Sequence, residues 1–278
     1  MELSRVVVAT DASEAGRAAI RAGRLVAEAS GARLTVMTAA LKSAAAVAAG
    51  AGGWDEGIDS LEALARHLRA ELGPDALPAD IELEVVPGLP GIEVPRYAEE
   101  HDASLVVLGR KPRSQAARLV MGDTADAVAR RSRVPCLIVP PARTALKRVL
   151  VALDGTVRGK IVCDTACDFA RAIGAELGVV TIERQHVGEP EALADQVPGA
   201  RSELVAKTAR ELAKRCGLGV EVIIRRGDPV REIMHVAAEW DVLAVGYHRG
   251  GPPGIIEGGS VARRLAHQVP GALLTVPL

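Results

Sequence analysis

The sequence predicts an α/β fold built from two tandem, doubly wound domains, each with a five-stranded parallel sheet. Three observations predict it: the length, an internal repeat, and a regular alternation of strand-like and helix-like segments. The chain has 278 residues, nearly twice a domain length of about 150. Apolar residues make up 49% of it and charged residues 25%, which is typical of a globular protein with a sizeable core.

An internal repeat divides the chain into two copies of one unit. The opening segment Arg5–Ser13 (RVVVATDAS) returns 143 residues later as Arg148–Thr156 (RVLVALDGT). Further along, Leu105–Gly109 returns 137 residues later as Val242–Gly246. Matches in the same order at a nearly constant separation indicate a tandem duplication with small loop deletions. We therefore expect domains over residues 1–141 and 147–278, joined by a short linker.

Each copy has the same order of strands and helices. Short apolar runs predict strands in the first copy over Val6–Ala9, Arg33–Thr38, Ile81–Val86, Leu105–Leu108 and Cys136–Val139. Apolar residues at helical spacing predict its helices over Ser13–Ala29, Ile58–Leu72, Gly91–Glu100 and Thr124–Ser132. The glycines that follow the first two helices, Gly31 and Gly73, are typical helix ends.

The second copy repeats this order. Its predicted strands are Val149–Leu153, Leu177–Ile182, Val220–Ile224, Val242–Val245 and Leu273–Val276. Its predicted helices are Val157–Ile173, Arg201–Cys216, Pro229–Ala238 and Ser260–Gln268. Strands that are apolar throughout and alternate with helices indicate a parallel sheet covered on both faces.

Charge and composition exclude several classes of partner. A net charge of −1 offers no basic field for a nucleic-acid backbone, and aromatic residues, at 2%, offer no stacking platform for bases. The most apolar low-complexity segment, Ala44–Gly53, is half the length of about 20 residues that a membrane span needs. The chain opens without a signal-peptide pattern, so we expect a cytoplasmic protein with no membrane or nucleic-acid partner.

The four cysteines show no spacing typical of a disulfide framework or a metal site. Cys163 and Cys167 are four residues apart, which places them on one face of a helix rather than in a redox motif. We expect all four, which include Cys136 and Cys216, to be free thiols in a reducing cytosol.

The polar residues that follow the predicted strands point to a ligand site. In a doubly wound sheet, ligands bind beyond the carboxyl ends of the strands, where the strand order reverses. Asp11 and Asp154 follow the first strand of each copy, and Gly109 and Gly246 follow the fourth. A glycine there lets backbone N–H groups approach a phosphate, and the start of the next helix adds further donors.

The loop that begins at Gly246 and ends at Gly259-Ser260 resembles the nucleotide loop of the universal stress protein family. That pattern is Gly, two residues, Gly, nine residues, Gly, then Ser or Thr. Gly246, Gly259 and Ser260 fit its spacing, whereas Arg249 replaces the second glycine. The resemblance extends over both copies and includes the opening Val-Ala-x-Asp and the closing Val-Pro.

The resemblance implies that the second copy binds ATP, with Mg²⁺ left open. It carries nucleotide contacts onto nine positions: Ala152, Asp154, Ile182, Val245, Gly246, Arg249, Gly259, Ser260 and Val261. By this resemblance Asp154 contacts the ribose and adenine region, and the backbone of Ile182 reads the adenine edge. Gly246, Gly259 and Ser260 surround the phosphates. Arg249 either clamps a phosphate or fills the space that a glycine leaves open.

The first copy has a more degenerate loop. Its matching positions are Ala9, Asp11, Ala39, Gly109 and Gly122. Pro112 stands where the second glycine belongs and removes an N–H donor. Asp123 stands where Ser or Thr belongs and would place a carboxylate against phosphates. Three basic residues nearby, Arg110, Lys111 and Arg113, leave some anion binding open.

Each of these features also has a purely structural interpretation. Asp11 and Asp154 could only cap the helix that follows, and Ser260 could do the same. Gly109 and Gly246 could be ordinary strand-exit turns. Arg249 could be a solvated loop residue, and Trp240 is expected to pack in the core.

No catalytic set and no metal-ligand cluster stands out in the sequence. The leading hypothesis is therefore an ATP-binding regulatory or stress-response protein that acts on an unknown protein partner, with nucleotide mainly in the second copy. The alternative is an interaction or scaffold protein of the same fold without nucleotide. A slow ATPase or a nucleotide-processing enzyme is the third hypothesis.

The last strands suggest how the two copies associate. Leu137–Val139 and Leu274–Val276 are short apolar edges, and an exposed apolar edge invites pairing. In the family that the chain resembles, these strands pair antiparallel between two domains. The resemblance therefore implies an intramolecular pseudo-dimer, with a further homodimer left open.

Overall fold

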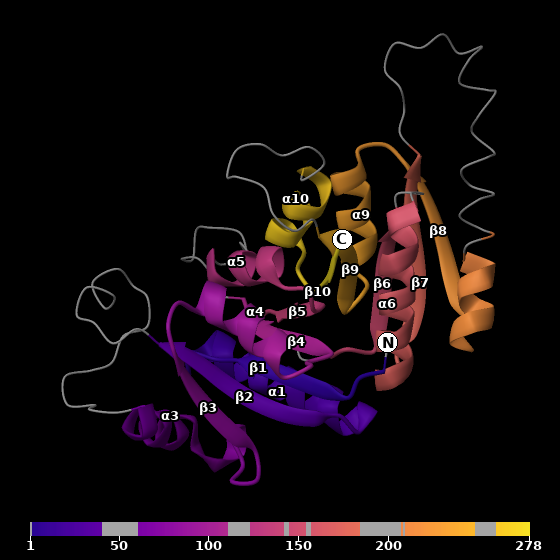
Figure 1. Cartoon of the computed structure of the whole chain (residues 1–278). Coiled ribbons are helices and arrows are strands. Elements are labelled where there is room, and N and C mark those ends of the chain that lie inside the picture. Colours follow the sequence, from indigo (N-terminus) through magenta and orange to yellow (C-terminus); the bar gives the residue numbers. More distant parts are fainter. Residues whose placement is uncertain are drawn as a thin grey trace, which may run out of the picture. The chain divides into compact units, whose positions relative to one another are not determined.

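The computed structural model describes residues 2–40, 61–110, 123–141, 145–153, 157–183, 207, 209–247 and 260–278. The chain forms two compact units, residues 2–144 and residues 145–276, and each is an α/β unit (Figure 1).

The first unit has a parallel sheet of five strands. These are β1 (Arg5–Ala9), β2 (Arg33–Ala40), β3 (Glu82–Pro87), β4 (Leu105–Gly109) and β5 (Cys136–Val139). Their order across the sheet is β3-β2-β1-β4-β5, and every neighbouring pair is parallel. The strand order reverses at β1, where Val6 is in register with Leu34 on one side and Leu105 on the other.

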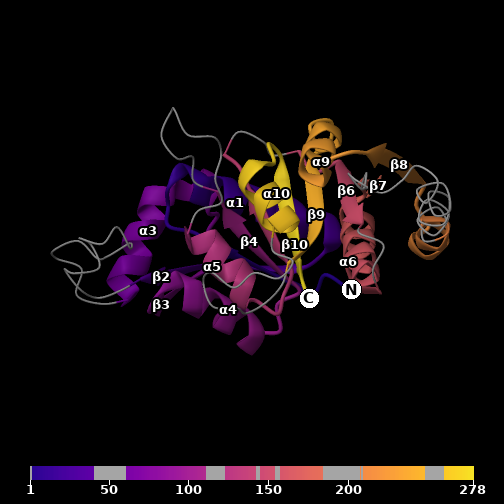
Figure 2. The ribbon, with the colours of Figure 1, turned by 90° about the horizontal axis from the view of Figure 1, so that it is seen from above.

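Helices cover both faces of this sheet. They are α1 (Glu14–Ser30), α3 (Leu61–Ala76), α4 (Pro90–Glu100) and α5 (Asp123–Arg131). Helix α1 contacts α3, and α4 contacts α5, with the two pairs on opposite sides of the strands (Figure 2). This arrangement buries the aliphatic strands from both sides: Val6, Val7 and Val8 of β1 are fully buried, as is Ile20 of α1.

The second unit repeats the arrangement. Its strands are β6 (Arg148–Leu153), β7 (Glu176–Glu183), β8 (Val220–Arg226), β9 (Val242–Tyr247) and β10 (Ala272–Pro277), in the order β10-β9-β6-β7-β8. Its helices are α6 (Val157–Ile173), a helix over residues 209–216, α9 (Pro229–Ala237) and α10 (Ser260–Gln268). Helices α6 and α9 lie on opposite sides of the sheet (Figure 2). The predicted fold class is thus confirmed.

The predicted elements differ from the observed ones only near their ends. Strand β2 continues to Ala40, two residues past the predicted end. Helix α3 continues to Ala76 across a kink at Gly73, whose φ of 73° and ψ of 167° are not helical. The glycine therefore interrupts the helix as predicted, but a further turn follows it. Residues 58–60 and 201–206 of the predicted helices lie outside the described residues.

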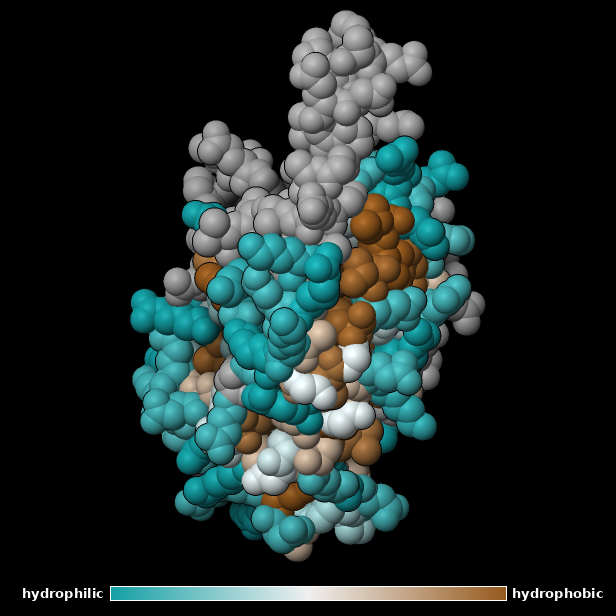
Figure 3. Space-filling view, turned by 90° about the vertical axis from the view of Figure 1, so that its right-hand side faces the viewer, coloured by the Kyte–Doolittle hydropathy of each residue, from teal (hydrophilic) through white to brown (hydrophobic). Residues whose placement is uncertain are grey.

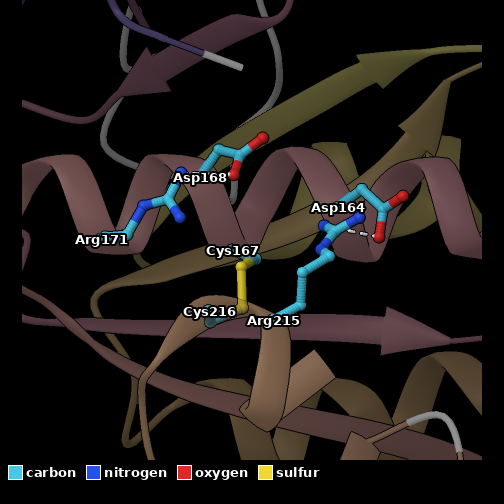
Figure 4. Close-up of a disulfide and its surroundings, with 6 residues drawn as sticks. All are labelled: Asp164, Cys167, Asp168, Arg171, Arg215 and Cys216. Atoms are coloured by element: carbon cyan, nitrogen blue, oxygen red, sulfur yellow. Dashed lines mark hydrogen bonds and ion pairs between the residues drawn. A yellow bond between two sulfur atoms is a disulfide. The ribbon is translucent and has the colours of Figure 1, made fainter. Parts of the chain in front are cut away.

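The prediction of four free thiols is wrong. Cys167 of α6 and Cys216, the last residue of the helix over 209–216, form a disulfide with a Cα–Cα distance of 5.8 Å (Figure 4). Cys136 and Cys163 are buried thiols. The two bonded cysteines are 49 residues apart in the sequence, and only the packing of one helix against the other brings them together. Cys163 and Cys167 do lie one turn apart on α6, as predicted.

Strand β8 exposes apolar side chains at the edge of the second sheet. The exposed fractions of Val222 and Ile224 are 39% and 37%. Figure 3 shows the side of the molecule that lies to the right in Figure 1 and includes β7 and β8, where apolar surface interrupts the hydrophilic surface. Apolar patches on a protein surface commonly mark interaction sites.

Candidate functional site

The chain leaves β1 through a compact turn at the carboxyl edge of the first sheet. The Thr10 N–H donates to the carbonyl of Met37 on β2 over 3.0 Å. The Thr10 hydroxyl accepts a hydrogen bond from the N–H of Ala12 over 3.1 Å. Ala12 has a φ of 58°, in the left-handed region, which lets the chain reverse within two residues. The turn therefore fixes where Asp11 leaves the strand.

Asp11 supports a helix cap but does not cap the helix itself. Its Oδ1 accepts hydrogen bonds from the N–H of Ser13, over 3.1 Å, and from the Ser13 hydroxyl. Ser13 is the N-cap of α1, and its Oγ accepts a hydrogen bond from the N–H of Gly16 over 3.3 Å. Asp11 is exposed, so its carboxylate faces solvent at the rim of the sheet while it orients the cap. Ser13, and not Asp11, is thus the residue that caps the helix, and Asp11 contributes to the cap through its hydrogen bonds to Ser13.

Gly16 allows α1 to start directly behind this turn. A Cβ atom at Gly16 would lie 2.4 Å from the Thr10 hydroxyl and 2.9 Å from Oδ1 of Asp11. Real Cβ atoms do not come so close to other heavy atoms, so only glycine fits. The second copy has Gly159 at the matching position, 143 residues on, and it is buried in α6. A buried glycine in the first turn of this helix is therefore a shared feature of both copies.

A threonine at the end of the second strand holds the end of the first strand in each unit. The hydroxyl of Thr38 donates to the carbonyl of Thr10 over 2.7 Å. In the second unit the hydroxyl of Thr181 donates to the carbonyl of Leu153 over 3.0 Å. The threonine side chain therefore holds the carbonyl at the end of the first strand in the same way in both units.

Ala39 and Ile182 follow these two threonines directly. Ala9, the last residue of β1, is in register with Met37, so Ala39 lies past the end of β1 at the carboxyl edge. Leu153 is likewise in register with Thr181, so Ile182 lies past the end of β6. Both side chains are buried. These positions are beside the exits of the two first strands.

The glycines after the fourth strands are explained by close packing. A Cβ atom at Gly109 would lie 2.1 Å from the backbone oxygen of Ala15 in α1. A Cβ atom at Gly246 would lie 2.5 Å from Cδ1 of Leu278 and 3.1 Å from Cγ2 of Val162. The alternative of a structural role is therefore supported for both glycines. In neither case is open space left on that side of the glycine.

The residue after Gly109 differs between the two units. Arg110 is fully buried, and its N–H donates to the carbonyl of Val139 over 2.8 Å. Burial lowers the pKa of Arg110 to about 10, so the guanidinium still carries its charge near neutral pH. The matching residue of the second unit is Tyr247, which is also buried. The first unit thus has a buried positive charge at this edge, where the second has a phenol.

The structure brings together the described members of each predicted site. Ala9, Asp11, Ala39 and Gly109 lie at the carboxyl ends of the adjacent strands β2, β1 and β4. In the second unit the described members lie near the carboxyl ends of β6, β7 and β9, which are also adjacent. They are Ala152, Ile182, Val245 and Gly246. Ser260 is the first residue of α10 and Val261 the second, and α10 contacts β9.

The remaining predicted positions lie outside the described residues. They are Gly122 in the first unit, and Asp154, Arg249 and Gly259 in the second. The first-unit loop residues Pro112, Lys111 and Arg113 lie outside them as well. Asp123 is the first residue of α5. The roles suggested for these positions stay predictions.

Sequence reasoning missed three residues that shape the site: Ser13, Thr38 and Gly16. The repeat contained the signal for two of them, since Thr38 and Gly16 recur as Thr181 and Gly159 at the offset of 143 that relates the two aspartates. Both copies have the same residue at the end of the second strand and the same residue at the start of the first helix. Such identity indicates that the two copies need the same local geometry at these places. Ser13 recurs as Thr156, another residue suited to an N-cap.

Two further classes of site can be addressed within the described part of the chain. There, no group of three or more His, Cys, Asp or Glu side chains is arranged to hold a metal ion. Nor does any helix in that part have the length and apolar character needed to cross a bilayer.

Two five-stranded sheets, each with a reversal of strand order at its first strand, define a tandem, doubly wound α/β protein. The universal stress protein family model matches residues 2–140 and again residues 145–277. The chain therefore belongs to the universal stress protein family and is a tandem member of it.

The chain was also compared with solved structures. A universal stress protein from Archaeoglobus fulgidus superposes with a TM-score of 0.72 at 19% identity, covering 100% of this chain and 99% of that one. A functionally unknown protein from Pseudomonas aeruginosa gives 0.67 at 15% identity, covering 99% and 92%. A universal stress protein in complex with cAMP matches 51% of this chain and 99% of its own, at 29% identity and a TM-score of 0.37. No curated protein matches the chain in sequence.

Proposed function

We propose that the chain is an ATP-binding regulatory protein of the stress response, with the nucleotide in the second unit. ATP would lie across the carboxyl edge formed by β7, β6 and β9. Asp154 would contact the ribose, the backbone of Ile182 the adenine edge, and the loop from Gly246 to Ser260 the phosphates. Mg²⁺ would accompany the phosphates. Binding would shift the conformation or the partner surface, and any hydrolysis would be slow.

One observation supports this proposal most directly. Thr181 fixes the carbonyl of Leu153 over 3.0 Å, and Asp154 and Ile182 follow these two residues in the chain. The two positions that are expected to read adenine and ribose are therefore attached to one rigid link between neighbouring strands. Ser260 at the start of α10 adds a helix N-terminus, where backbone N–H groups favour a phosphate.

The proposal is tested by nucleotide content and by titration. The chain is purified without added nucleotide and denatured, and the supernatant is analysed for ATP, ADP and AMP. ATP is then titrated into the wild type and into Gly259→Asp. Saturable binding with a Kd below about a millimolar that Gly259→Asp abolishes is the expected result. Absence of such binding in the wild type would refute the nucleotide proposal.

The two aspartates provide a matched pair for assigning the unit. We expect Asp154→Ala to abolish ATP binding, because it removes the proposed ribose contact. Asp11→Ala should leave ATP binding unchanged, since Asp11 belongs to the more degenerate copy and is engaged with Ser13. Equal losses in the two variants would refute the assignment to the second unit.

A second candidate function is an interaction module without nucleotide. Two observations favour it: packing accounts for Gly109 and Gly246, and Val222 and Ile224 expose apolar surface on β8. The two candidates are distinguished by the titration above and by Val222→Thr/Ile224→Thr. Loss of a binding partner in this variant, together with no ATP binding in the wild type, would favour the interaction module.

Location and assembly belong to the same proposal. We propose that the protein acts in the cytoplasm, that its last strands pair within the chain as a pseudo-dimer, and that any partner is a protein rather than a nucleic acid. A further homodimer is tested by light scattering of the purified chain at several concentrations, with and without ATP. A nucleotide-processing enzyme is the third candidate and the least favoured, because no catalytic set stands out in the sequence.

A further inference from the structure

The second unit joins two of its helices by a covalent bond that the first unit lacks. Cys167 on α6 is fully buried, and Cys216 at the end of the helix over 209–216 is 4% exposed. Their Cα–Cα distance of 5.8 Å is an ordinary one for a disulfide, so the two backbones need no displacement to form it. Figure 4 shows the bond between the two helices, with Arg215 paired to Asp164 beside it, over 2.6 Å.

The first unit uses arginine hydrogen bonds to backbone carbonyls at the matching place. Arg24, which is 143 residues before Cys167, donates from Nη1 to the carbonyl of Asp75 over 2.9 Å. Arg17 on the same helix donates to the carbonyls of Leu72 and Glu71, over 2.9 Å and 2.8 Å. In the first unit α1 therefore holds the end of α3 by guanidinium groups. In the second unit the disulfide connects the corresponding helices, α6 and the helix over 209–216.

The bridged helix has one buried face and one exposed face. Along residues 209–216, Ala209, Leu212 and Cys216 are buried, whereas Arg210, Glu211, Lys214 and Arg215 are exposed. The ion pair of Arg215 with Asp164 is partly exposed, and such pairs contribute little to stability. The disulfide therefore adds a covalent connection between α6 and a helix that has one face in solvent.

We propose that Cys167 and Cys216 form a reversible thiol–disulfide site whose redox state controls the docking of the helix over 209–216 on α6. The co-substrate is a low-molecular-weight thiol. Its thiolate attacks one sulfur of the bridge and forms a mixed disulfide, and the other cysteine leaves as a thiolate that takes up a proton. A second small thiol resolves the mixed disulfide. Two electrons pass to the protein, which gains two thiols, and one small-molecule disulfide is released.

Access to the buried sulfurs comes from local opening of the same helix. A helix with an exposed face opens more readily than the core strands, and opening exposes both sulfurs to the small thiol. Cys163 lies one turn before Cys167 on α6 and remains a thiol in the bridged state. It and Cys136 supply two buried internal controls. This inference does not depend on nucleotide binding.

The experiment uses the full chain equilibrated at a series of reduced-to-oxidised glutathione ratios. Each sample is quenched in acid, denatured and alkylated, and the four cysteines are mapped by mass spectrometry. We expect Cys167 and Cys216 to pass together, and reversibly, from alkylated to bridged as the ratio falls. Cys136 and Cys163 should be alkylated at every ratio. Cys163→Ala should show the same transition as the wild type.

Hydrogen exchange then measures the docking of the helix. We expect the amides of residues 209–216 to exchange about tenfold faster or more in the reduced protein, with β6 and β7 unchanged. Helix α3 of the first unit, which has no bridge, should exchange equally in both states. The Cys167→Ser/Cys216→Ser variant should match the reduced wild type and should not respond to glutathione. If this variant does not fold, the comparison of oxidised with reduced wild type still decides the point.

Three results would overturn the proposal. The first is alkylation of Cys167 and Cys216 at every glutathione ratio, which would mean that no bridge forms. The second is a bridge that persists in the native protein at every ratio and in excess dithiothreitol, which would mean that it is not reversible. The third is equal exchange of residues 209–216 in the oxidised and reduced states, which would mean that the bridge does not control docking.

Discussion

The indole ring of Trp240 lies directly against Gly178 of β7. A Cβ atom at Gly178 would be 2.2 Å from Cη2 of Trp240, so the ring occupies the space of a missing side chain. The guanidinium of Arg148 covers the ring at 4.3 Å from its centroid. The first unit has the reverse sizes at the matching positions, Thr35 and Ala103. In the first unit the residue on the strand is therefore the larger of the two, and in the second unit the residue before the fourth strand is the larger.

This exchange of sizes predicts strong coupling between the two positions. Trp240→Ala should cost about 3–5 kcal/mol in the free energy of unfolding, because it leaves a cavity over β7. Gly178→Thr should cost about 1–3 kcal/mol, because the new side chain meets the indole ring. The double variant restores the arrangement of the first unit. Its cost should fall short of the sum of the two single costs by about 1 kcal/mol or more, measured by urea unfolding.

Additive costs in that cycle would contradict the packing described here. The contact to Arg148 gives an independent check, since Arg148→Met keeps the aliphatic stem over the ring and removes the charge. We expect Arg148→Met to change stability much less than Trp240→Ala.

The glycine at the end of β4 predicts a large effect of a single methyl group. Gly109→Ala should destabilise the first unit by about 1–3 kcal/mol, because the methyl group meets the backbone oxygen of Ala15. Gly246→Ala should cost less, since the nearest atom is the end of the Leu278 side chain, which can move. Urea unfolding followed by circular dichroism measures both.

Gly219 provides the control for these two variants. A Cβ atom at Gly219 meets no atom within 4 Å. Gly219→Ala should therefore leave stability unchanged or raise it by about 0.4–1 kcal/mol, through the lower entropy of the unfolded chain. Equal costs at Gly109 and Gly219 would refute the packing role of Gly109.

The threonine hydroxyls at the ends of β2 and β7 should contribute equally to the two units. Thr38→Val and Thr181→Val each remove a hydrogen bond to the carbonyl at the end of the first strand. Each should cost about 1 kcal/mol, since the carbonyl loses its partner while the side chain keeps its shape. Differential scanning calorimetry of the two variants measures the cost.

Thr35 is the matched control for the hydroxyl effect. Its Oγ1 is buried and has no hydrogen-bond partner among the described residues. Thr35→Val removes a hydroxyl that was desolvated without compensation, so we expect it to be neutral or stabilising. If Thr35→Val were as costly as Thr38→Val, the hydrogen bond to Thr10 would not be the cause.

The cap of α1 predicts a further measurable loss. Ser13→Ala removes the side-chain acceptor for the N–H of Gly16 and should cost about 1 kcal/mol. Ser13→Gly should cost only a few tenths of a kcal/mol, as is usual at N-caps. Asp11→Ala should fall between them, because it removes a hydrogen bond that orients Ser13 but leaves the cap itself. Guanidinium unfolding of the three variants gives the order, and a larger loss for Asp11→Ala than for Ser13→Ala would contradict it.

The repeat made most of the fold predictable. Strands such as Val6–Ala9 and Val149–Leu153 are apolar throughout, and only a sheet covered on both faces can bury such runs. The duplication then fixed the number of domains. The ends of β2 and α3 were predicted less well, because an edge residue such as Ala40 carries no periodic signal that distinguishes strand from loop.

The candidate site was predictable in its position but not in its contacts. Asp11, Ala39 and Gly109 lie at the adjacent strand ends where the order of β2, β1 and β4 requires them to lie. That Asp11 binds Ser13, and that Gly109 faces Ala15, could not be predicted from spacing. Both contacts depend on how closely α1 approaches the sheet, which is set by Gly16 and by the turn at Thr10.

The sequence by itself determined a tandem parallel α/β protein, because a duplicated pattern of local hydrophobicity suffices to specify strands, helices and their order. The family was indicated separately, by the resemblance of the loop from Gly246 to Ser260. Only the tertiary structure decided which distant side chains meet. Cys167 bonds Cys216 where Arg24 binds the carbonyl of Asp75, and Trp240 fills the space beside Gly178. These pairings depend on helix and strand positions to within a few ångströms, and no periodicity along the chain encodes a distance of that kind.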